Sequence, residues 1–184
     1  HGYYGRGAVG VIAGNKVVGY ENIANLYDEA IKIPFIIRAP ALIEPGQEIE
    51  IPVSNIDVFP SIMSALAIKA PNDLNLSGID LIQISNEQDT LESRPIFAQY
   101  AMRNFGHSDL RMVRSGKWKL IKRFNLKANA ELVDELYDLE ADPNEETNLI
   151  KQVSNQPIYE KLDNLIHSWM ISIDDPLLSS SYKQ

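Results

Sequence analysis

Cysteine is absent from the 184-residue sequence. Disulfides, thiolate metal sites and cysteine nucleophiles are therefore excluded within this chain. The sequence also has no run of about 18 apolar residues, the length that an α-helix needs to cross a bilayer. We therefore expect no membrane span.

Positive charge is scarce as well. The chain carries 17 Lys and Arg residues against 25 Asp and Glu residues, which gives a formal net charge of -8. A non-specific nucleic-acid binder needs the opposite balance, because it must neutralise phosphates. We therefore expect no nucleic-acid partner. Apolar residues still make up 45% of the chain, enough for a packed core.

The first 33 residues are rich in glycine, which favours loops and short turns because glycine adopts backbone conformations that other residues resist. The sequence opens inside such a loop, with His1-Gly2-Tyr3, and not with a basic segment followed by an apolar one. We therefore expect that upstream sequence is missing.

The next segments predict two strands and one helix. Residues 34–38 form a short apolar run between two prolines and predict a buried strand. Residues 49–53 alternate in polarity and predict an edge strand. Residues 57–66 predict a helix, with Asp57 as its N-cap and Pro60 in its first turn.

Residues 69–93 are polar and predict a loop with one short apolar piece, so we expect a boundary there, between parts 1–85 and 86–184. Beyond the boundary, a strand is expected over 96–100. The segments on either side of Ser115-Gly116 carry the signal of a two-residue hairpin.

Two further elements follow the hairpin. Residues 135–139 alternate and predict another antiparallel strand. Apolar residues recur at helical spacing over 158–169 and predict an amphipathic helix. We expect Trp118, on a strand of the hairpin, and Trp169, on this helix, to lie in the core. An antiparallel sheet must be covered on at least one face, and we expect this helix to cover it.

Several segments, in order, resemble the C-terminal third of the sulfatase family, within the alkaline-phosphatase-like superfamily. They are similar to the end of its Ser-Asp-(His/Asn)-Gly loop, its Tyr-Glu-x-x-x-Arg-x-Pro motif, its Val-Ser-x-x-Asp-x-x-Pro-Thr helix start, its C-terminal hairpin and its C-terminal signature: residues 1–3, 26–40, 53–62, 112–121 and 135–149. Each match is weak alone, but together they cover nearly the whole chain.

The resemblance implies an α/β fold that becomes α+β in the C-terminal part. Residues 1–85 would form the end of an alkaline-phosphatase-like sheet, and residues 86–184 a small antiparallel sheet packed by a C-terminal helix. The implied activity is hydrolysis of a sulfate ester on a sulfated small molecule or sugar. Family members act with a formylglycine nucleophile and a divalent cation, usually Ca²⁺, and many are periplasmic or secreted.

The nucleophile motif of the family, Cys/Ser-x-Pro-x-Arg, does not occur in this sequence. The chain alone is therefore expected to be inactive, with the nucleophile supplied from upstream. Two alternatives remain open: a phosphoryl or phosphonate ester hydrolase of the same superfamily, and a non-catalytic accessory module. We also expect the fragment to self-associate, because the strand at 34–38 would lack its neighbours and leave apolar edges exposed.

The resemblance marks three candidate site residues. His1 falls beside a metal-binding position of the family, although it could equally be a terminal histidine without a metal. Lys16 fits the Lys-x-x-x-Tyr-Glu spacing of a sulfate-contacting lysine, but the family register selects Tyr27 instead of Tyr20, so a solvated lysine is the alternative. His107 lies in a loop from which family members contact substrate, and its alternative is a surface turn.

The acidic residues between 138 and 146 resemble a calcium loop only superficially, because the Asp-x-Asp-x-Asp-Gly pattern is missing. We expect them to serve structure, through a turn at Asp142-Pro143 and a local cap after it.

Overall fold

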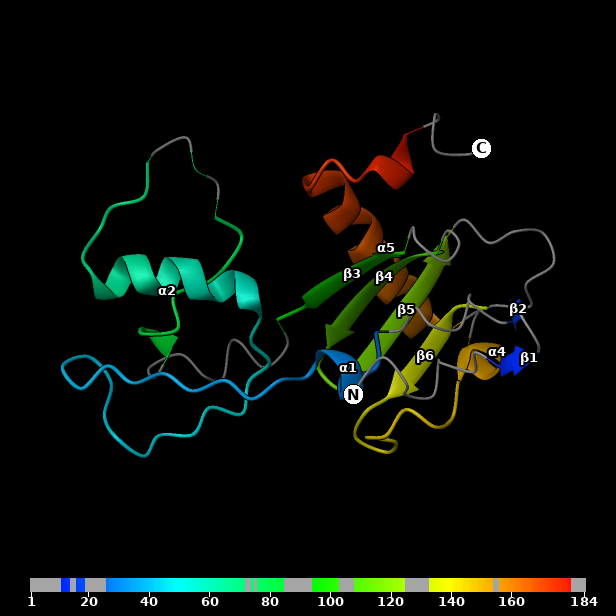
Figure 1. Ribbon diagram of the computed structural model, residues 1–184, viewed down its shortest axis with the longest axis horizontal. Coiled ribbons are helices and arrows are strands. Elements are labelled where there is room, and N and C mark those ends of the chain that lie inside the picture. The colour runs from blue at the N-terminus through cyan, green and yellow to red at the C-terminus, as the bar shows by residue number, and fades with distance from the viewer. Residues whose placement is uncertain are drawn as a thin grey trace. The chain divides into compact units, whose positions relative to one another are not determined.

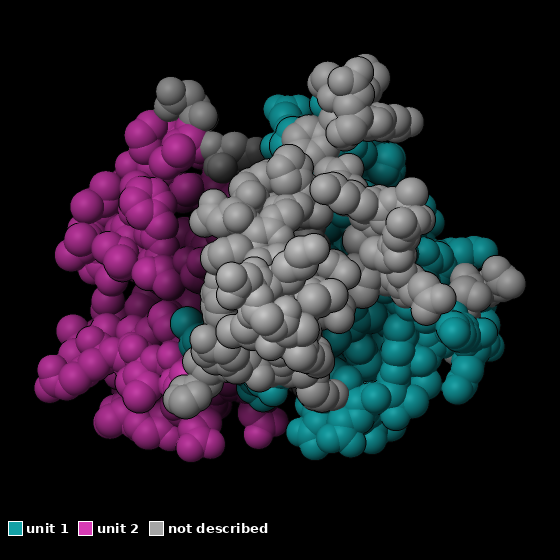
Figure 2. Space-filling view, turned by 45° about the vertical axis from the view of Figure 1, so that its right-hand side comes forward, with its two compact units in different colours: residues 1–33, 97–184 teal, residues 34–96 magenta. Residues whose placement is uncertain are grey.

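The computed structural model describes residues 11–13, 16–18, 26–71, 74, 76–84, 94–102, 108–124, 133–153 and 156–179. The chain divides into two compact units (Figure 2). Unit 1 comprises residues 1–33 and 97–184, and unit 2 comprises residues 34–96. These two units are not the parts 1–85 and 86–184 expected from the family resemblance. That division into domains stays a prediction.

Unit 1 is built around a four-stranded sheet in the order β3-β4-β5-β6, namely β3 (Ile96–Met102), β4 (Ser108–Ser115), β5 (Trp118–Phe124) and β6 (Glu135–Asp138) (Figure 1). The pairs β4–β5 and β5–β6 are antiparallel. The predicted strands in this part of the chain are confirmed. The chain has the expected α/β class, with α+β character here.

The hairpin between β4 and β5 differs from the prediction by one residue. Ser115 pairs with Trp118, so the two loop residues are Gly116 and Lys117. Gly116 has a φ of 56°, in the left-handed region that glycine occupies without steric cost. The conformation that the turn requires therefore falls on the glycine, which is the first loop residue and not the second.

One face of the sheet packs against α5 (Pro157–Ser172), as expected. The register places Val113, Leu120 and Leu136 side by side across three strands. All three are fully buried, and they form one core with residues spaced four apart along the helix: Leu162, Ile166 and Met170. Pro157 stands at the start of α5, where a missing N–H costs little.

The opposite face of the sheet is covered too, which the sequence analysis did not predict. Residues 26–31, including the single turn α1 (Asp28–Ile31), lie on this face. Leu26 is buried there in a core with Leu110, Met112, Ile121 and Tyr137. The strands carry apolar residues at consecutive positions and not only at alternate ones, which is typical of a sheet buried on both faces.

Unit 1 also contains shorter elements, including the 3-10 turn Pro176–Leu178 that follows α5. β1 (Val11–Ala13) and β2 (Lys16–Val18) pair in an antiparallel hairpin, so the expectation of loops and turns alone was wrong here. α4 (Ile150–Val153) follows the acidic turn. In the part of the chain that the structure describes, no helix is both long and apolar enough to cross a bilayer.

Unit 2 contains the predicted helix, α2 (Val58–Ala65), preceded by the 3-10 turn Asn55–Asp57. Asp57 precedes α2 as expected, but its side chain does not cap that helix. Its carboxylate instead accepts the backbone N–H of Ser54, at 2.8 Å, and that of Ile79, at 2.9 Å. Asp57 therefore fixes the 3-10 turn and ties it to the loop around residue 79.

The two strands predicted in unit 2 are absent: residues 34–38 and 49–53 have no strand structure. A strand needs a neighbour to satisfy its backbone groups, and the described residues of unit 2 form no sheet that could supply one. Residues 34–38 are exposed, whereas Ile51 is buried in a small core with Leu81 and Ile84.

Candidate functional site

The three candidate site residues are not tested by the structure. His1 and His107 lie outside the described residues. Lys16 belongs to β2 and pairs with Ala13 across the β1–β2 hairpin, but only its backbone is described. The assignments of His1 to metal and of Lys16 and His107 to substrate stay predictions.

A resident metal ion does not fit the described side chains. Among them, no group of three or more histidine, aspartate or glutamate residues could hold a cation. The turn after β6 uses its carboxylates locally: Asp142 accepts the backbone N–H groups of Glu146, at 3.0 Å, and Thr147, at 2.8 Å. Asp138 accepts those of Glu140 and Ala141. The structural interpretation of this acidic segment is confirmed.

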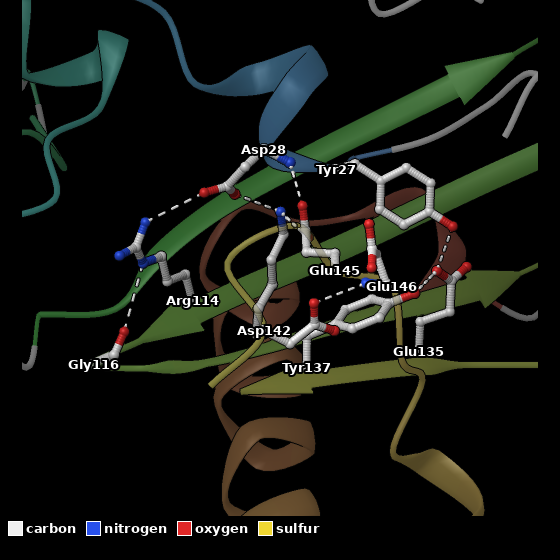
Figure 3. A network of polar contacts seen from close by, with 10 residues as sticks. Tyr27, Asp28, Arg114, Gly116, Glu135, Tyr137, Asp142, Glu145 and Glu146 are labelled. Carbon is white, nitrogen blue, oxygen red and sulfur yellow. Dashed lines mark hydrogen bonds and ion pairs between the residues drawn. The ribbon is translucent and has the colours of Figure 1, made fainter. Parts of the chain in front are cut away.

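A buried polar site in unit 1 lies on the face of the sheet that residues 26–31 cover. Lys119 of β5 is fully buried, and its Nζ lies 2.7 Å from Asp28 Oδ1 and 2.7 Å from Glu145 Oε1. Arg114, beside Lys119 on β4, lies 3.6 Å from the other oxygen of Asp28 (Figure 3). A buried ammonium group is tolerated only with such counter-charges.

Glu145 joins the turn after β6 to α1. Its Oε2 accepts the backbone N–H of Asp28 at 2.6 Å, while its Oε1 contacts Lys119. Only 3% of Glu145 is exposed, and its φ is 57°. This left-handed conformation costs a residue with a Cβ about 1 kcal/mol, so the turn holds the carboxylate inward against a local backbone preference.

A second network borders this site (Figure 3). Glu135 Oε2 accepts hydroxyl hydrogens from Tyr27 and Tyr137, both at 2.7 Å, and Glu135 Oε1 accepts from Nε of Arg123 at 2.9 Å. Burial and the adjacent Glu135 carboxylate raise the pKa of Tyr27 to about 12, and the same causes raise the pKa of Tyr137. Both phenols therefore stay protonated at neutral pH and act as donors, not as nucleophiles or bases.

A pocket of about 330 Å³ opens beside the buried lysine, lined by Asp28, Glu29, Lys32, Pro143, Asn144 and Glu145. Its lining carries three carboxylates and one lysine, a balance that disfavours an anionic ester. Lys32, which stands at the arginine position of the Tyr-Glu-x-x-x-Arg-x-Pro motif that residues 26–40 resemble, is exposed at this pocket. We therefore do not place sulfate in it.

Sequence reasoning missed Lys119, Glu145 and Glu135. A signal for Lys119 exists: it lies between Trp118 and Leu120, inside a strand that is apolar on both faces, so its charge requires a buried partner. No local pattern identifies that partner, because Asp28 lies 91 positions away.

The described residues of unit 1 thus form an antiparallel sheet with α5 packed on one face and residues 26–31 on the other. The chain belongs to the family described as N-sulphoglucosamine sulphohydrolase, C-terminal, whose model matches residues 19–171. This match confirms the resemblance to the C-terminal part of sulfatases.

Individual relatives agree with the family assignment. The chain is 28% identical over 156 residues to an uncharacterized sulfatase of Escherichia coli (strain K12). The matched region covers 85% of this chain and 29% of the relative. It is also 28% identical over 176 residues to an ulvan-active sulfatase of Formosa agariphila. That match covers 82% of this chain and 35% of the relative. The chain therefore spans about a third of the length of these curated relatives.

A solved structure shares the fold. It is a protein in complex with its substrate D-glucosamine-2-N,6-O-disulfate, and it matches 66% of this chain and 24% of its own chain with a TM-score of 0.52. Sequence identity to it is 18%, so this likeness concerns the fold alone.

Proposed function

We propose that this chain is the C-terminal part of a sulfuric ester hydrolase. The observation that carries the proposal is the family match over residues 19–171, which includes the sheet, most of its helical cover and the segment 26–31. Both relatives described above are sulfatases, so the phosphoryl and phosphonate alternative is not favoured. A non-catalytic module is not favoured for the same reason.

The reactive groups of such an enzyme would come from elsewhere in the longer protein. The sequence contains neither cysteine nor a Ser-x-Pro-x-Arg motif, and the described side chains offer no metal site. A formylglycine nucleophile and a divalent cation, Ca²⁺ by family habit, would therefore be held mainly by residues outside this chain, with His1 as a candidate neighbour of the metal.

The chain's own contribution would be to bind and orient the ester. We propose that Lys16 contacts the sulfate group, where an ammonium group offsets negative charge, and that His107 contacts the remainder of the substrate. A sulfated sugar is the proposed substrate class. Its support is that one relative is an ulvan-active sulfatase and that one structural neighbour was solved with a sulfated glucosamine.

The test uses the full-length enzyme that contains this chain. Sulfate release from a panel of sugar and aryl sulfates is expected, with much slower phosphate release from the matching phosphate esters. Lys16→Met should lower kcat/KM at least tenfold, whereas Lys161→Met, at an exposed position of α5, should leave it unchanged. Faster phosphate than sulfate release would overturn the proposal.

We further propose that the isolated chain binds a second copy of itself through unit 2. Eleven large apolar side chains are exposed among the described residues 34–74, including Ile36, which is 90% exposed. Phe59 and Ile62 of α2 and Leu66, which follows its last residue, recur at helical spacing and are 53%, 51% and 64% exposed. Monomers rarely leave such apolar surface uncovered.

Light scattering over a range of protein concentrations tests this second proposal. The isolated chain should form dimers or larger species, and Ile62→Lys with Leu66→Lys should shift it toward monomer. The control is Ile171→Lys, which changes an exposed isoleucine of unit 1. A monodisperse wild-type monomer at high concentration would contradict the proposal.

A further inference from the structure

The two outer strands of the sheet differ in what lies along their free edges, and the edge of β6 is closed. The backbone N–H of Leu136 donates to the side-chain oxygen of Asn148 at 3.0 Å, and its carbonyl accepts the backbone N–H of Leu149 at 2.9 Å. The side-chain amide of Asn148 also donates to the carbonyl of Asp134 at 3.1 Å. Residues 148–149 therefore occupy the positions at which a further strand would pair with β6.

The edge of β3 is open by comparison. β3 pairs with β4 on one side, and no described segment forms backbone hydrogen bonds along its other side (Figure 1). An outer strand of this kind presents a row of N–H and C=O groups to which an incoming strand can bind.

β3 also lacks the sequence features that usually protect an open edge. Proteins keep such edges short or place charged residues and prolines on them. The sequence of β3, Ile-Phe-Ala-Gln-Tyr-Ala-Met, is seven residues long and contains neither a charge nor a proline. Its isoleucine, phenylalanine and tyrosine favour extended structure. The edge therefore suits an uncharged strand as its partner.

The side chains of β3 are arranged so that the strand complements itself. Phe97 packs on the core beneath α5, whereas Ala98 and Tyr100 pack on the opposite face, and Gln99 is exposed at the centre of the strand. An antiparallel copy centred on Gln99 would place Ala98 opposite Tyr100, and Phe97 opposite Ala101. Each of these cross-strand pairs joins a large and a small side chain on the same face.

We propose that β3 pairs antiparallel with β3 of a second copy of this chain, around a two-fold axis at Gln99. The two four-stranded sheets would then form one continuous sheet. This contact lies in unit 1, apart from Ile96, so it is separate from the contact proposed for unit 2. Two separate self-contacts on one chain can link copies into species larger than a dimer. Neither the β3 contact nor its test depends on ester hydrolysis.

The β3 contact is expected to be the weaker of the two. A single pair of strands buries much less than the roughly 1,600 Å² of a standard stable interface. Dimers should therefore form only at protein concentrations on the order of 100 µM and above. At lower concentrations a chain whose unit 2 contact has been removed should be largely monomeric.

The first test measures this weak dimer by sedimentation in the Ile62→Lys, Leu66→Lys variant, which lacks the unit 2 contact. Adding Gln99→Lys should raise the dissociation constant about tenfold, because two like charges then meet at the axis. Ile171→Lys is the matched control, because it adds the same charge at a 57% exposed position of α5 and should leave the dimer unchanged. A parent that stays monomeric at the highest concentration, or a Gln99→Lys variant that dimerises as well as its parent, would overturn the proposal.

A charge-reversal experiment separates pairing at Gln99 from a loss of folding. In the same background, Gln99→Glu alone should also weaken the dimer. An equal mixture of the Gln99→Lys and Gln99→Glu variants should form heterodimers about tenfold more tightly than either variant forms homodimers, because opposite charges then face each other. Misfolded chains would not recover on mixing. No gain on mixing would contradict the two-fold axis at Gln99.

Amide hydrogen exchange locates the contact independently. In the parent, exchange over residues 97–101 should slow as the protein concentration rises, because the outer N–H groups of β3 become hydrogen-bonded. Exchange in β6, whose edge residues 148–149 already close, should not change with concentration. Protection that appears in unit 2 and not in β3 would show that the copies meet elsewhere, and the proposal would fail.

Discussion

The indole ring of Trp169 on α5 lies flat against the ring of Phe97 on β3, with centroids 4.9 Å apart and an interplanar angle of 7°. β3 is one of the two outer strands of the sheet and lies next to β4. Both rings are partly buried and pack against the core that α5 shares with the sheet. This stack therefore ties the edge strand to the helix that covers it.

Trp169→Ala should lower the free energy of unfolding by about 3 kcal/mol, because it removes an aromatic pair and leaves a cavity at the edge of the core. Urea denaturation monitored by circular dichroism measures the change. Ile171→Ala, at a 57% exposed position of the same helix, is the control and should cost less than about 0.5 kcal/mol. Equal losses in the two variants would show that the stack does not secure β3.

The fold of unit 1 could be predicted where its signal is local. Three signals depend only on neighbours in sequence. They are the alternation of polar and apolar residues along β6, the glycine in the turn of the hairpin, and the helical spacing of apolar residues in α5. The cover supplied by residues 26–31 could not be predicted in this way, because it depends on pairs such as Leu26 with Tyr137. The adjacent apolar residues Leu120 and Ile121 were the available sign that both faces are buried.

The candidate site could be predicted less well. His1, Lys16 and His107 followed from a family resemblance, and the described structure does not test them. The buried contacts of Lys119 with Asp28 and Glu145 were missed because these three charged residues come from distant segments of the chain. Conversely, residues 34–38 have the composition of a buried strand, but a strand needs a hydrogen-bonding neighbour, and composition cannot supply one.

Gly78 makes a close backbone approach that a side chain would block. A Cβ at this position would lie 2.2 Å from the carbonyl oxygen of Ile56, in the 3-10 turn before α2. Gly78→Ala should therefore displace the backbone and destabilise unit 2 by about 3 kcal/mol, within the range known for overpacking. Thermal unfolding of the variant measures the loss.

Gly46→Ala separates this clash from the ordinary cost of replacing glycine. Gly46 has a φ of 78°, and a Cβ added to it would meet no atom within 4 Å, so its replacement encounters backbone strain alone. We expect a loss of about 1 kcal/mol. A loss at Gly78 no larger than that at Gly46 would contradict the proposed clash.

The Tyr27 hydroxyl predicts a loss of stability in alkali. Its pKa is raised by burial and by Glu135 to about 12, above the value of about 10 in an unfolded chain. A raised pKa contributes stability that is fully present below pH 10 and is lost as the pH rises toward 12. The advantage of wild type over Tyr27→Phe in unfolding free energy should therefore shrink over this range.

Measurements between pH 7 and 9 serve as the internal control for Tyr27. Neither state ionises this phenol there, so the difference between wild type and Tyr27→Phe should stay constant, at about 1 kcal/mol for one hydrogen bond. A difference that grows above pH 10 would contradict the predicted direction.

Asp57 predicts the opposite dependence, a loss of stability in acid. Its fully buried carboxylate is bound by both terminal nitrogens of Arg94, at 2.9 and 2.7 Å, and by two backbone N–H groups. Burial alone would raise the pKa of this carboxyl. The bonds from Arg94 and from the amides of Ile79 and Ser54 outweigh burial and hold the pKa below its ordinary value.

A depressed carboxyl pKa contributes stability that is present above the unfolded value of about 4 and is lost as the pH falls through the folded value. Asp57→Asn removes the charge that Arg94 pairs with, and at pH 7 it should cost about 3 kcal/mol, as expected when one partner of a buried pair is lost. The difference in unfolding free energy between wild type and variant should narrow between pH 5 and pH 2, because the Asp57 carboxylate of wild type then protonates as well.

Urea denaturation across this range measures the difference in unfolding free energy. The control is Glu140→Gln, at a 77% exposed side chain, which should show no such narrowing. A difference that stays constant down to pH 2 would mean that the Arg94 pair does not depress the Asp57 pKa.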